Sequence, residues 1–387
     1  MTDIRRYLLE TLLPFWAERA WDAAEGGFVA ELDMAGAPQP EPMRLCLVQS
    51  RCLYVFSHAA LLSDADWARR AAQRAFDFMT ARLRHENGLW VAAAEARPSG
   101  GRDERIDFYD QAFVLFSLAW RHRACGDAEA LALAGETARA LDRMLGDPVH
   151  GGWLESPDGA LPRRQNPHMH LLEALHALFE ATGDRHWLDR ANAVVALFHG
   201  RFFDASTGSL REFCDAGLRP LSGARGELRE PGHHMEWVWL LLHHHRLTGD
   251  AGVLAPARAL YDGACRHGVD ASGHLVETMT AQGEVIDAAH LLWPQTEAVK
   301  AALARHEMLG CDPAPARAFL DALWRVHVPA GGPLWINRAS PGGAPLGDRV
   351  PTRLLYHLVL CLAEWLRLHP AAQAPTAARR SLSGADA

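Results

Sequence analysis

Long apolar segments with helical character alternate with short glycine-led segments along the whole chain. Six of the long segments are apolar apart from their first turns, and they span residues 48–62, 107–120, 165–178, 230–245, 291–303 and 353–365. Five of them are followed by a small residue and an aspartate, and then by a second helical pattern. Because glycine suits the C-cap of one helix and aspartate the N-cap of the next, these turns predict helical hairpins.

A second marker, a glycine followed closely by an aromatic or aliphatic residue, recurs in step with these turns. These glycines, spaced 56 to 65 residues apart, are Gly27, Gly88, Gly152, Gly208, Gly273 and Gly332. The unit is therefore helix, turn, helix and short extended segment, and six copies fill most of the chain. Since no copy has the character of a capping repeat, we expect a closed ring, with the first helix of each hairpin inside and the second outside. The ring is predicted to be one domain over residues 1–370, and the small, polar segment 371–387 a disordered tail.

The composition narrows the partners and the compartment. The formal net charge is −8 and the arginines are scattered, so nucleic acid and anionic membranes are disfavoured as partners. No apolar run is long enough to span a membrane, and the N-terminus lacks the apolar region of a signal peptide. Seven cysteines without a CxxC spacing fit a reducing cytoplasm. Lys300 is the only lysine, so a phosphate-cradling GxxxxGK[ST] loop is absent.

Polar and ionisable residues recur near the start of every inner segment, at one level of the ring. They are Arg51; Tyr109, Asp110 and Gln111; His170; His233 and Glu236; Trp293, Gln295 and Glu297; and His357. Burying such groups without partners is costly, and a purely structural ring has no reason to carry them. The pattern therefore favours an apolar floor with functional groups above it, facing an open pocket at the mouth of the ring.

Structural interpretations stay open for some of these residues. His170 with Glu173, and His233 with Glu236, have the i, i+3 spacing of a pair bonded along one helix. Their repetition in two inner segments favours function. The histidines at 243–245 are interpreted as the solvated end of a helix.

Two further alternatives concern cations. Arg51 could form a buried ion pair, for which Glu297 is the candidate partner. His168 and His170, and His233 with Glu236, are of metal-ligand type. However, the two members of an HxH pair point to different faces of a helix, and no HExxH motif or cysteine cluster is present. No metal is predicted.

Five motifs in a specific order resemble the N-acylglucosamine 2-epimerase superfamily, which includes mannose isomerases, aldose–ketose isomerases and cellobiose 2-epimerases. They are QSRCLYVFSHA, NPHMHLLEAL, GHHMEWVWLL, WPQTEA and a late YH. The resemblance covers residues from about 10 to 368. It implies an all-α (α/α)6 barrel with short β segments at its mouth, in agreement with the sixfold repeat.

The resemblance also implies roles for single residues. His233 and His357 match the acid/base pair, and Glu236 matches the carboxylate beside the first histidine. His170 matches the residue that assists ring opening, and Arg51 the cation near the sugar oxygens. The residues implied as the remaining substrate-binding set are Tyr109, Asn166, Trp293, Gln295 and Glu297. The implied chemistry is proton transfer next to an aldehyde through a cis-enediolate, which needs no cofactor.

The sequence thus predicts a cytoplasmic isomerase acting on a free monosaccharide, with D-mannose and D-fructose as the expected pair. A sugar 2-epimerase uses the same intermediate and stays open as the nearer alternative. A glycoside hydrolase using Glu236 and Glu297, and a non-catalytic binding protein, are more distant alternatives. A homodimer is also left open.

Overall fold

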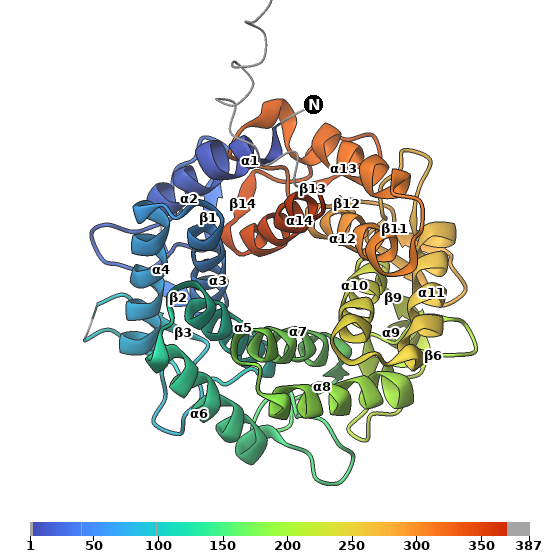
Figure 1. Cartoon of the computed structure of the whole chain (residues 1–387), viewed down its shortest axis with the longest axis horizontal. Coiled ribbons are helices and arrows are strands. Elements are labelled where there is room, and N and C mark those ends of the chain that lie inside the picture. The colour runs from blue at the N-terminus through green and yellow to red at the C-terminus, as the bar shows by residue number, and fades with distance from the viewer. Residues whose placement is uncertain (1–2, 40, 98, 370–387) are drawn as a thin grey trace, which may run out of the picture.

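Six helical hairpins form a closed ring in the computed structural model, which describes residues 3–39, 41–97 and 99–369 (Figure 1). The expected tail, 371–387, lies outside the described residues. The inner helices of the ring are α3 (Cys46–Ser63), α5 (Phe108–Cys125), α7 (Gln165–Thr182), α10 (Pro231–Thr248), α12 (Leu292–Leu309) and α14 (Leu355–Leu368). The predicted (α/α)6 barrel is confirmed, and solved structures of the same fold are described below.

A second layer of helices surrounds the inner ring. Its members are α1 (Ile4–Arg6), which continues through a π-helical segment into α2 (Leu13–Arg19), and α4 (Asp66–Phe78), α6 (Ala128–Leu145), α8 (Arg185–Leu197), α11 (Leu254–Gly263) and α13 (Ala314–His327). In five hairpins the inner helix precedes the outer helix, as predicted. In the sixth, the outer layer beside α14 comes from the N-terminal α1. The chain therefore closes the ring by joining its two ends.

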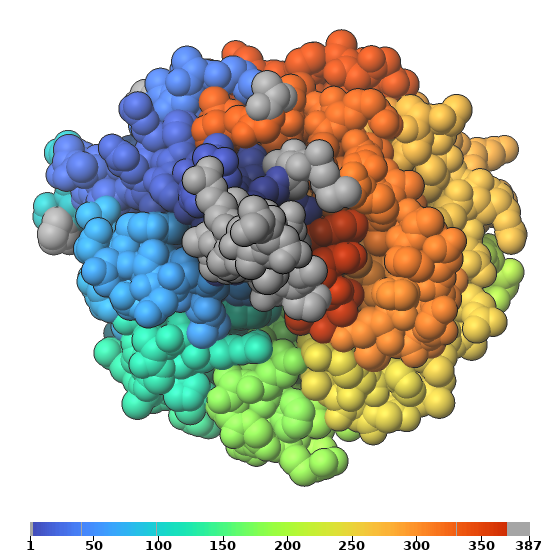
Figure 2. Space-filling model, turned by 45° about the horizontal axis from the view of Figure 1, so that its top comes forward, coloured from blue at the N-terminus to red at the C-terminus, as the bar shows by residue number. Residues whose placement is uncertain are grey.

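Contacts between the two ends hold this closure. The hydroxyl of Tyr7 donates to the carbonyl of Gly332, and the indole N–H of Trp16 donates to the carbonyl of Pro333 at 2.7 Å. Strand β1 (Glu31–Asp33) also pairs antiparallel with β14 (Arg349–Pro351). In Figure 2 the colours follow one another round the molecule, and blue N-terminal residues lie against orange C-terminal ones.

Short antiparallel strands occupy the connections from each outer helix to the next inner helix. They are β2 (Met43–Leu45), β3 (Ala93–Glu95), β4 (Arg102–Asp103), β5 (Arg163–Arg164), β6 (Phe203–Asp204), β7 (Ser209–Leu210), β8 (Phe213–Cys214), β9 (Leu228–Arg229), β10 (Thr278–Thr280), β11 (Val285–Asp287), β12 (His290–Leu291) and β13 (Arg338–Ala339); the short helix α9 (Gly223–Glu227) precedes β9. They form sheets of two or three strands. Because every such connection leads to the N-terminal end of an inner helix, the strands gather at one mouth of the ring.

The second, third and fourth hairpin turns follow the predicted capping chemistry, whereas in the fifth the N-cap of α13 is Pro313. Gly183 takes a left-handed φ of 71° at the end of α7, and the side chain of Asp184 accepts from the backbone of His186. In the first hairpin the pair Ser63-Asp64 is shifted by one residue, and Asp64 itself takes the left-handed conformation, with φ 51°. Asparagine and aspartate are the non-glycine residues that tolerate this region best.

A side chain near the start of five inner helices ties the neighbouring glycine-led segment to the barrel. Gln49 exchanges two hydrogen bonds with the backbone of Phe28, and Gln111 does the same with Trp90. Gln295 exchanges two with Leu275. In the third and fourth repeats the backbone N–H groups of Trp153 and Leu210 donate to the Nε2 atoms of His168 and His234. These five side chains therefore stabilise the scaffold.

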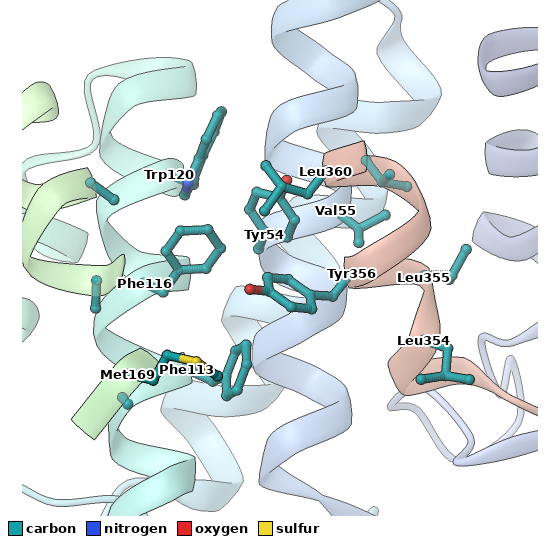
Figure 3. Packing of buried hydrophobic residues seen from close by; sticks show 14 of the residues in the cluster. Tyr54, Val55, Phe113, Phe116, Trp120, Met169, Leu354, Leu355, Tyr356 and Leu360 are labelled. Carbon is teal, nitrogen blue, oxygen red and sulfur yellow. The ribbon is translucent and has the colours of Figure 1, made fainter. Parts of the chain in front are cut away.

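An aromatic layer fills the interior of the ring where α3, α5 and α14 meet. The ring of Tyr356 lies 5.0 Å from Phe113 and 5.6 Å from Tyr54, centroid to centroid. Figure 3 shows Tyr356 pointing from α14 toward Phe113 and Phe116. This layer forms part of the apolar floor that the sequence predicts. No helix in the described part of the chain is long and apolar enough to cross a membrane.

Candidate active site

A cavity of about 340 Å³ opens at the mouth where the inner helices begin. This volume suits a small ligand. Most of its lining comes from the first two turns of the six inner helices, and the lining residues are Leu47, Arg51, Tyr109, Asn166, His170, Glu230, His233, Glu236, Leu291, Trp293, Asn337, Arg353, Leu354 and His357. The N-terminal ends of helix dipoles carry partial positive charge, so the cavity favours negative charge that develops in a bound molecule.

The two histidines predicted as an acid/base pair face this cavity together. The ring of Trp293 lies 4.9 Å from the ring of His233 and 5.7 Å from that of His357. Trp293 therefore contacts both imidazoles and sets one wall between them. Gly232 allows this close packing, because a Cβ there would come within 2.5 Å of the Trp293 ring.

His233 is paired with a carboxylate that the sequence did not single out. Its Nδ1 lies 2.8 Å from Glu212 Oε2 and 3.5 Å from Glu230 Oε2. Its Nε2 lies 3.2 Å from the side-chain amide of Asn166. The i, i+3 pairing suggested for His233 and Glu236 is wrong, because Glu212, on an extended segment, is the carboxylate that bonds the imidazole.

The surroundings of His233 favour the imidazolium. Burial alone would disfavour the charged ring, but Glu212 and Glu230 outweigh it and raise the pKa of His233 to about 10. In turn, burial raises the pKa of Glu230 to about 7, with Glu212 adding to the rise and His233 opposing it. At neutral pH His233 therefore carries a proton that it can donate.

His357 has the same kind of partner as His233, but its imidazole is neutral. Its Nδ1 lies 2.8 Å from Glu297 Oε1. The other oxygen of Glu297 forms a fully buried ion pair with Lys300, with 2.7 Å between Oε2 and Nζ. Burial lowers the pKa of His357 to about 3, although Glu297 pulls the other way. His357 is therefore a neutral imidazole at neutral pH, with Nδ1–H facing Glu297 and the lone pair of Nε2 left free.

A third histidine lies between the floor and the cavity. His170 Nδ1 is 3.1 Å from Glu173 Oε2, which also accepts from the hydroxyl of Tyr356 at 2.5 Å. His170 Nε2 lies 3.9 Å from Glu236 Oε1. Burial and then the nearby Glu297 raise the pKa of Glu236 well above its ordinary value, whereas Lys300 and His233 act in the opposite direction.

Arg51 supplies a cation from α3. One guanidinium nitrogen donates to the hydroxyl of Tyr109 at 2.8 Å and another to the carbonyl of Arg353. The guanidinium carbon lies 4.1 Å from the centre of the Phe113 ring. The suggested ion pair between Arg51 and Glu297 is wrong, because the carboxylate is turned toward α14 and the described partners of Arg51 are neutral oxygens and aromatic faces.

The structure brings together eight of the ten predicted site residues. Gln295 does not line the cavity, because its amide holds the backbone of Leu275 and Leu291. Glu297 also lies behind the lining and reaches the cavity only through His357. The paired carboxylates that a glycoside hydrolase would need across the mouth are therefore not arranged by Glu236 and Glu297.

The sequence interpretation missed several groups at the site. Arg353 and Asn337 line the mouth, so Arg51 is not the single cation of the lining. Glu212 could have been found from the repeat. In the third, fourth and fifth repeats an apolar residue of the glycine-led segment is hydrogen-bonded to an inner helix. The residue two positions later is a glutamate in all three: Glu155, Glu212 and Glu277. Of the three, Glu212 pairs with a histidine, whereas Glu155 and Glu277 pair with arginines.

The run of histidines at 243–245 is not uniformly solvated. His244 is fully buried, and its Nδ1 lies 3.0 Å from His176 Nε2. Burial lowers the pKa of His244 to about 4. These rings lie at the C-terminal half of the inner helices, away from the candidate site, and they hold α7 against α10.

Three groups of side chains in the described ranges have the residue types and spacing to surround a cation. They are Asp270, His274 and His290; Glu212, Glu230 and His233; and Glu236, Glu297 and His357, each with polar atoms within 4.8 Å of one another. The second and third belong to the cavity just described, where the atoms already form His–Glu and Lys–Glu pairs. The absence of a metal requirement stays a prediction.

Comparisons with known proteins agree with this architecture. The profile of the N-acylglucosamine 2-epimerase family matches residues 26–361. A mannose-6-phosphate isomerase of Rhizobium meliloti is 32% identical over 382 residues, 94% of this chain and 95% of that protein. A D-mannose isomerase of Pseudomonas cannabina pv. alisalensis is 30% identical over 247 residues, 58% of this chain and 59% of that protein. The structure of a cellobiose 2-epimerase from Bacillus thermoamylovorans has a TM-score of 0.86 at 20% identity, with 95% of this chain and 98% of that chain covered.

Together the barrel and these relatives define the class as sugar isomerases and epimerases, which are enzymes built on an (α/α)6 barrel. The chain belongs to the N-acylglucosamine 2-epimerase family.

Proposed function

We propose that the protein is an aldose–ketose isomerase that interconverts free D-mannose and D-fructose. The observation that carries this proposal is a pair of imidazoles in one cavity with opposite protonation, His233 charged and His357 neutral. Titratable groups pushed apart in this way make a natural acid and base. The names of relatives, a D-mannose isomerase and a mannose-6-phosphate isomerase, support an aldose–ketose reaction on mannose or its phosphate.

In the proposed reaction, His357 Nε2 removes the proton from C2 of the open-chain aldose. The imidazolium of His233 donates a proton to the carbonyl oxygen at C1, which gives a cis-enediol. Returning the proton to C1, while the hydroxyl at C2 loses its proton to His233, gives the ketose and restores both histidines. The substrate gains and loses no electrons overall, so the step needs no oxidant or reductant.

Neighbouring groups are proposed to serve the same reaction. Asn166 presents its amide nitrogen to His233 Nε2, which suits the neutral imidazole left after proton transfer, and turning the amide over would present its oxygen to the imidazolium. Arg51 and the positive ends of the inner helices favour the partial negative charge that develops on the sugar oxygens during these proton transfers. Glu236, whose surroundings favour its acid form, lies beside His170, so the pair can supply an acid and a base for opening the sugar ring.

A 2-epimerase is the second candidate, because it shares the intermediate and only the site of reprotonation differs. Incubation with D-mannose in deuterated water separates the two by NMR. The isomerase produces fructose with deuterium at C1, whereas a 2-epimerase produces glucose with deuterium at C2. Glucose as the main product would overturn the isomerase proposal.

A second experiment tests whether the substrate is the free sugar or its phosphate. Free mannose is proposed as the better substrate, although Arg353 adds a second guanidinium at the mouth. Direct competition between mannose and mannose 6-phosphate tests this. A higher kcat/KM for the phosphate would make Arg353 the candidate anion contact and reject the free sugar as the preferred substrate.

A further inference from the structure

Lys300 is the only lysine of the chain, and its place in the barrel is unusual. It lies on α12, one turn after Glu297, and its side chain is fully buried. The ammonium nitrogen lies 2.7 Å from Glu297 Oε2 and 4.3 Å from the centre of the Trp239 ring. Lysine is rarely buried completely, and desolvating its charge is costly.

The charges around Lys300 explain why a cation is stable there. Three buried carboxylates act on it, Glu297 most strongly and then Glu236 and Glu173, and together they outweigh the burial that would lower its pKa. These carboxylates come from α12, α10 and α7. Among the described residues, the carboxylate that reaches Lys300 directly is Glu297.

A structural role alone is a weak explanation for this pair. Replacing a buried ion pair by apolar residues of similar volume is often neutral or stabilising, so such a pair is poor support for stability as its purpose. The geometry of the Lys300–Glu297 pair instead connects it to His357. One oxygen of Glu297 contacts Lys300 and the other contacts His357. The ammonium therefore fixes the position of the carboxylate, and the carboxylate in turn orients the imidazole.

We propose that Lys300 is a positioning residue for the isomerase reaction, whose ammonium fixes Glu297 so that Glu297 holds His357 with Nδ1 protonated and Nε2 free toward the sugar. Lys300 touches no substrate and acts through two other side chains. An orienting partner of this kind is commonly worth roughly 10- to 100-fold in activity. The inference rests on the sugar isomerase or epimerase class of the family and on no particular sugar.

The first test is Lys300→Met, which keeps the length and apolar body of the side chain. We expect kcat on any sugar that the wild type converts to fall roughly 10- to 100-fold. The KM should change little, since the sugar-contacting groups are untouched. Wild-type kcat in a folded Lys300→Met protein would overturn the proposal.

Chemical rescue separates charge from volume. In Lys300→Ala, propylammonium replaces the missing atoms with their charge, whereas propanol fills similar space without charge. We expect propylammonium, and not propanol, to restore part of kcat. Equal restoration by both compounds would mean that Lys300 only fills space.

A double-mutant cycle covers the case in which single variants fold poorly. Glu297→Gln with Lys300→Met removes both charges together. Because Lys300 works only through Glu297, the double variant should be no less active than Glu297→Gln alone. Independent losses that add up would overturn the proposal, and so would loss of folding in all three variants, which would make the pair a stability element.

A readout that needs no turnover keeps this inference apart from the proposed function. Imidazole nitrogen NMR of His357 should give the Nδ1–H tautomer in the wild type and a mixture with the Nε2–H tautomer in Lys300→Met. An unchanged tautomer would contradict the positioning role, whether or not any sugar is converted. If the wild type converts no sugar but the tautomer shifts, the proposed function fails and the positioning role stands.

Discussion

Two imidazole–carboxylate pairs meet at one cavity, with the same hydrogen-bond geometry but with one imidazole charged and the other neutral. His233 with Glu212 and His357 with Glu297 both have 2.8 Å between Nδ1 and the carboxylate oxygen, and all four residues are buried. Yet the pKa of His233 is raised to about 10, and that of His357 is lowered to about 3.

The difference comes from the other charges near each pair. Beside His233 a second carboxylate, Glu230, adds to Glu212, and together they outweigh burial. Beside His357 the charge of Glu297 is already matched by Lys300, and Arg51 adds further positive potential. A hydrogen-bonded carboxylate does not by itself decide whether a buried histidine is an acid or a base; the total charge around the pair does.

Removing either imidazole should have the largest effect on activity. We expect His233→Asn and His357→Asn to lower kcat roughly 100- to 10,000-fold, as is typical for a positioned acid or base. Sugar binding should survive, which calorimetry with D-mannose measures. Near-normal turnover in folded His233→Asn would place the chemistry elsewhere.

Removing the charge of Glu212 should bring the pKa of His233 closer to that of His357. In the wild type, His233 stays protonated until the pH approaches 10 and His357 stays neutral until the pH falls toward 3. The pH profile of kcat/KM should therefore be a broad plateau with one limb at each end. In Glu212→Gln the imidazolium loses its main support, so the alkaline limb should move toward neutral pH.

A matched control for that profile lies in the next repeat. Glu277 occupies the position equivalent to Glu212 but pairs with Arg338. Glu277→Gln should keep the alkaline limb in place. Equal shifts in both variants would mean that long-range charge, and not the contact with His233, sets the pKa.

Glu236→Gln should have a smaller effect than either change above. The surroundings of this side chain favour its acid form, and glutamine keeps one donor and one acceptor. We expect kcat to fall less than the roughly 100-fold that marks the loss of a positioned acid. The alkaline limb should shift less than in Glu212→Gln, because Glu236 does not bond His233 and ranks behind Glu212 and Glu230 in raising its pKa. An alkaline limb that moves as far as in Glu212→Gln would make Glu236 an equal support of the imidazolium.

Removing divalent cations should have the smallest effect of all. Arg51, Arg353 and the imidazolium of His233 supply positive charge at the cavity, so we expect full activity after dialysis against a chelator. The assay is turnover of D-mannose before and after treatment, with magnesium, manganese and zinc added back separately. Lost activity that one of these ions restores would contradict the cofactor-free reaction.

The sequence by itself determined the architecture and the level of the site. The repeat markers predicted the hairpins and their order, because capping at a turn is local chemistry that neighbouring residues decide. The motifs likewise located most of the cavity lining, since residues at equivalent depth of parallel inner helices must face the same mouth. The helix beside α14 was not predicted, because it comes from the opposite end of the chain.

Only the tertiary structure decided which groups pair. Glu236 is one turn from His233 in sequence, yet Glu212 is the partner, because a glycine-led segment carries it across to α10. Gln295 matches a family motif but serves the scaffold. The different charges of His233 and His357 depend on burial and on carboxylates and cations from α3, α10, α12 and the extended segment that carries Glu212. Distances between such groups are set by packing, and no spacing along the chain encodes them.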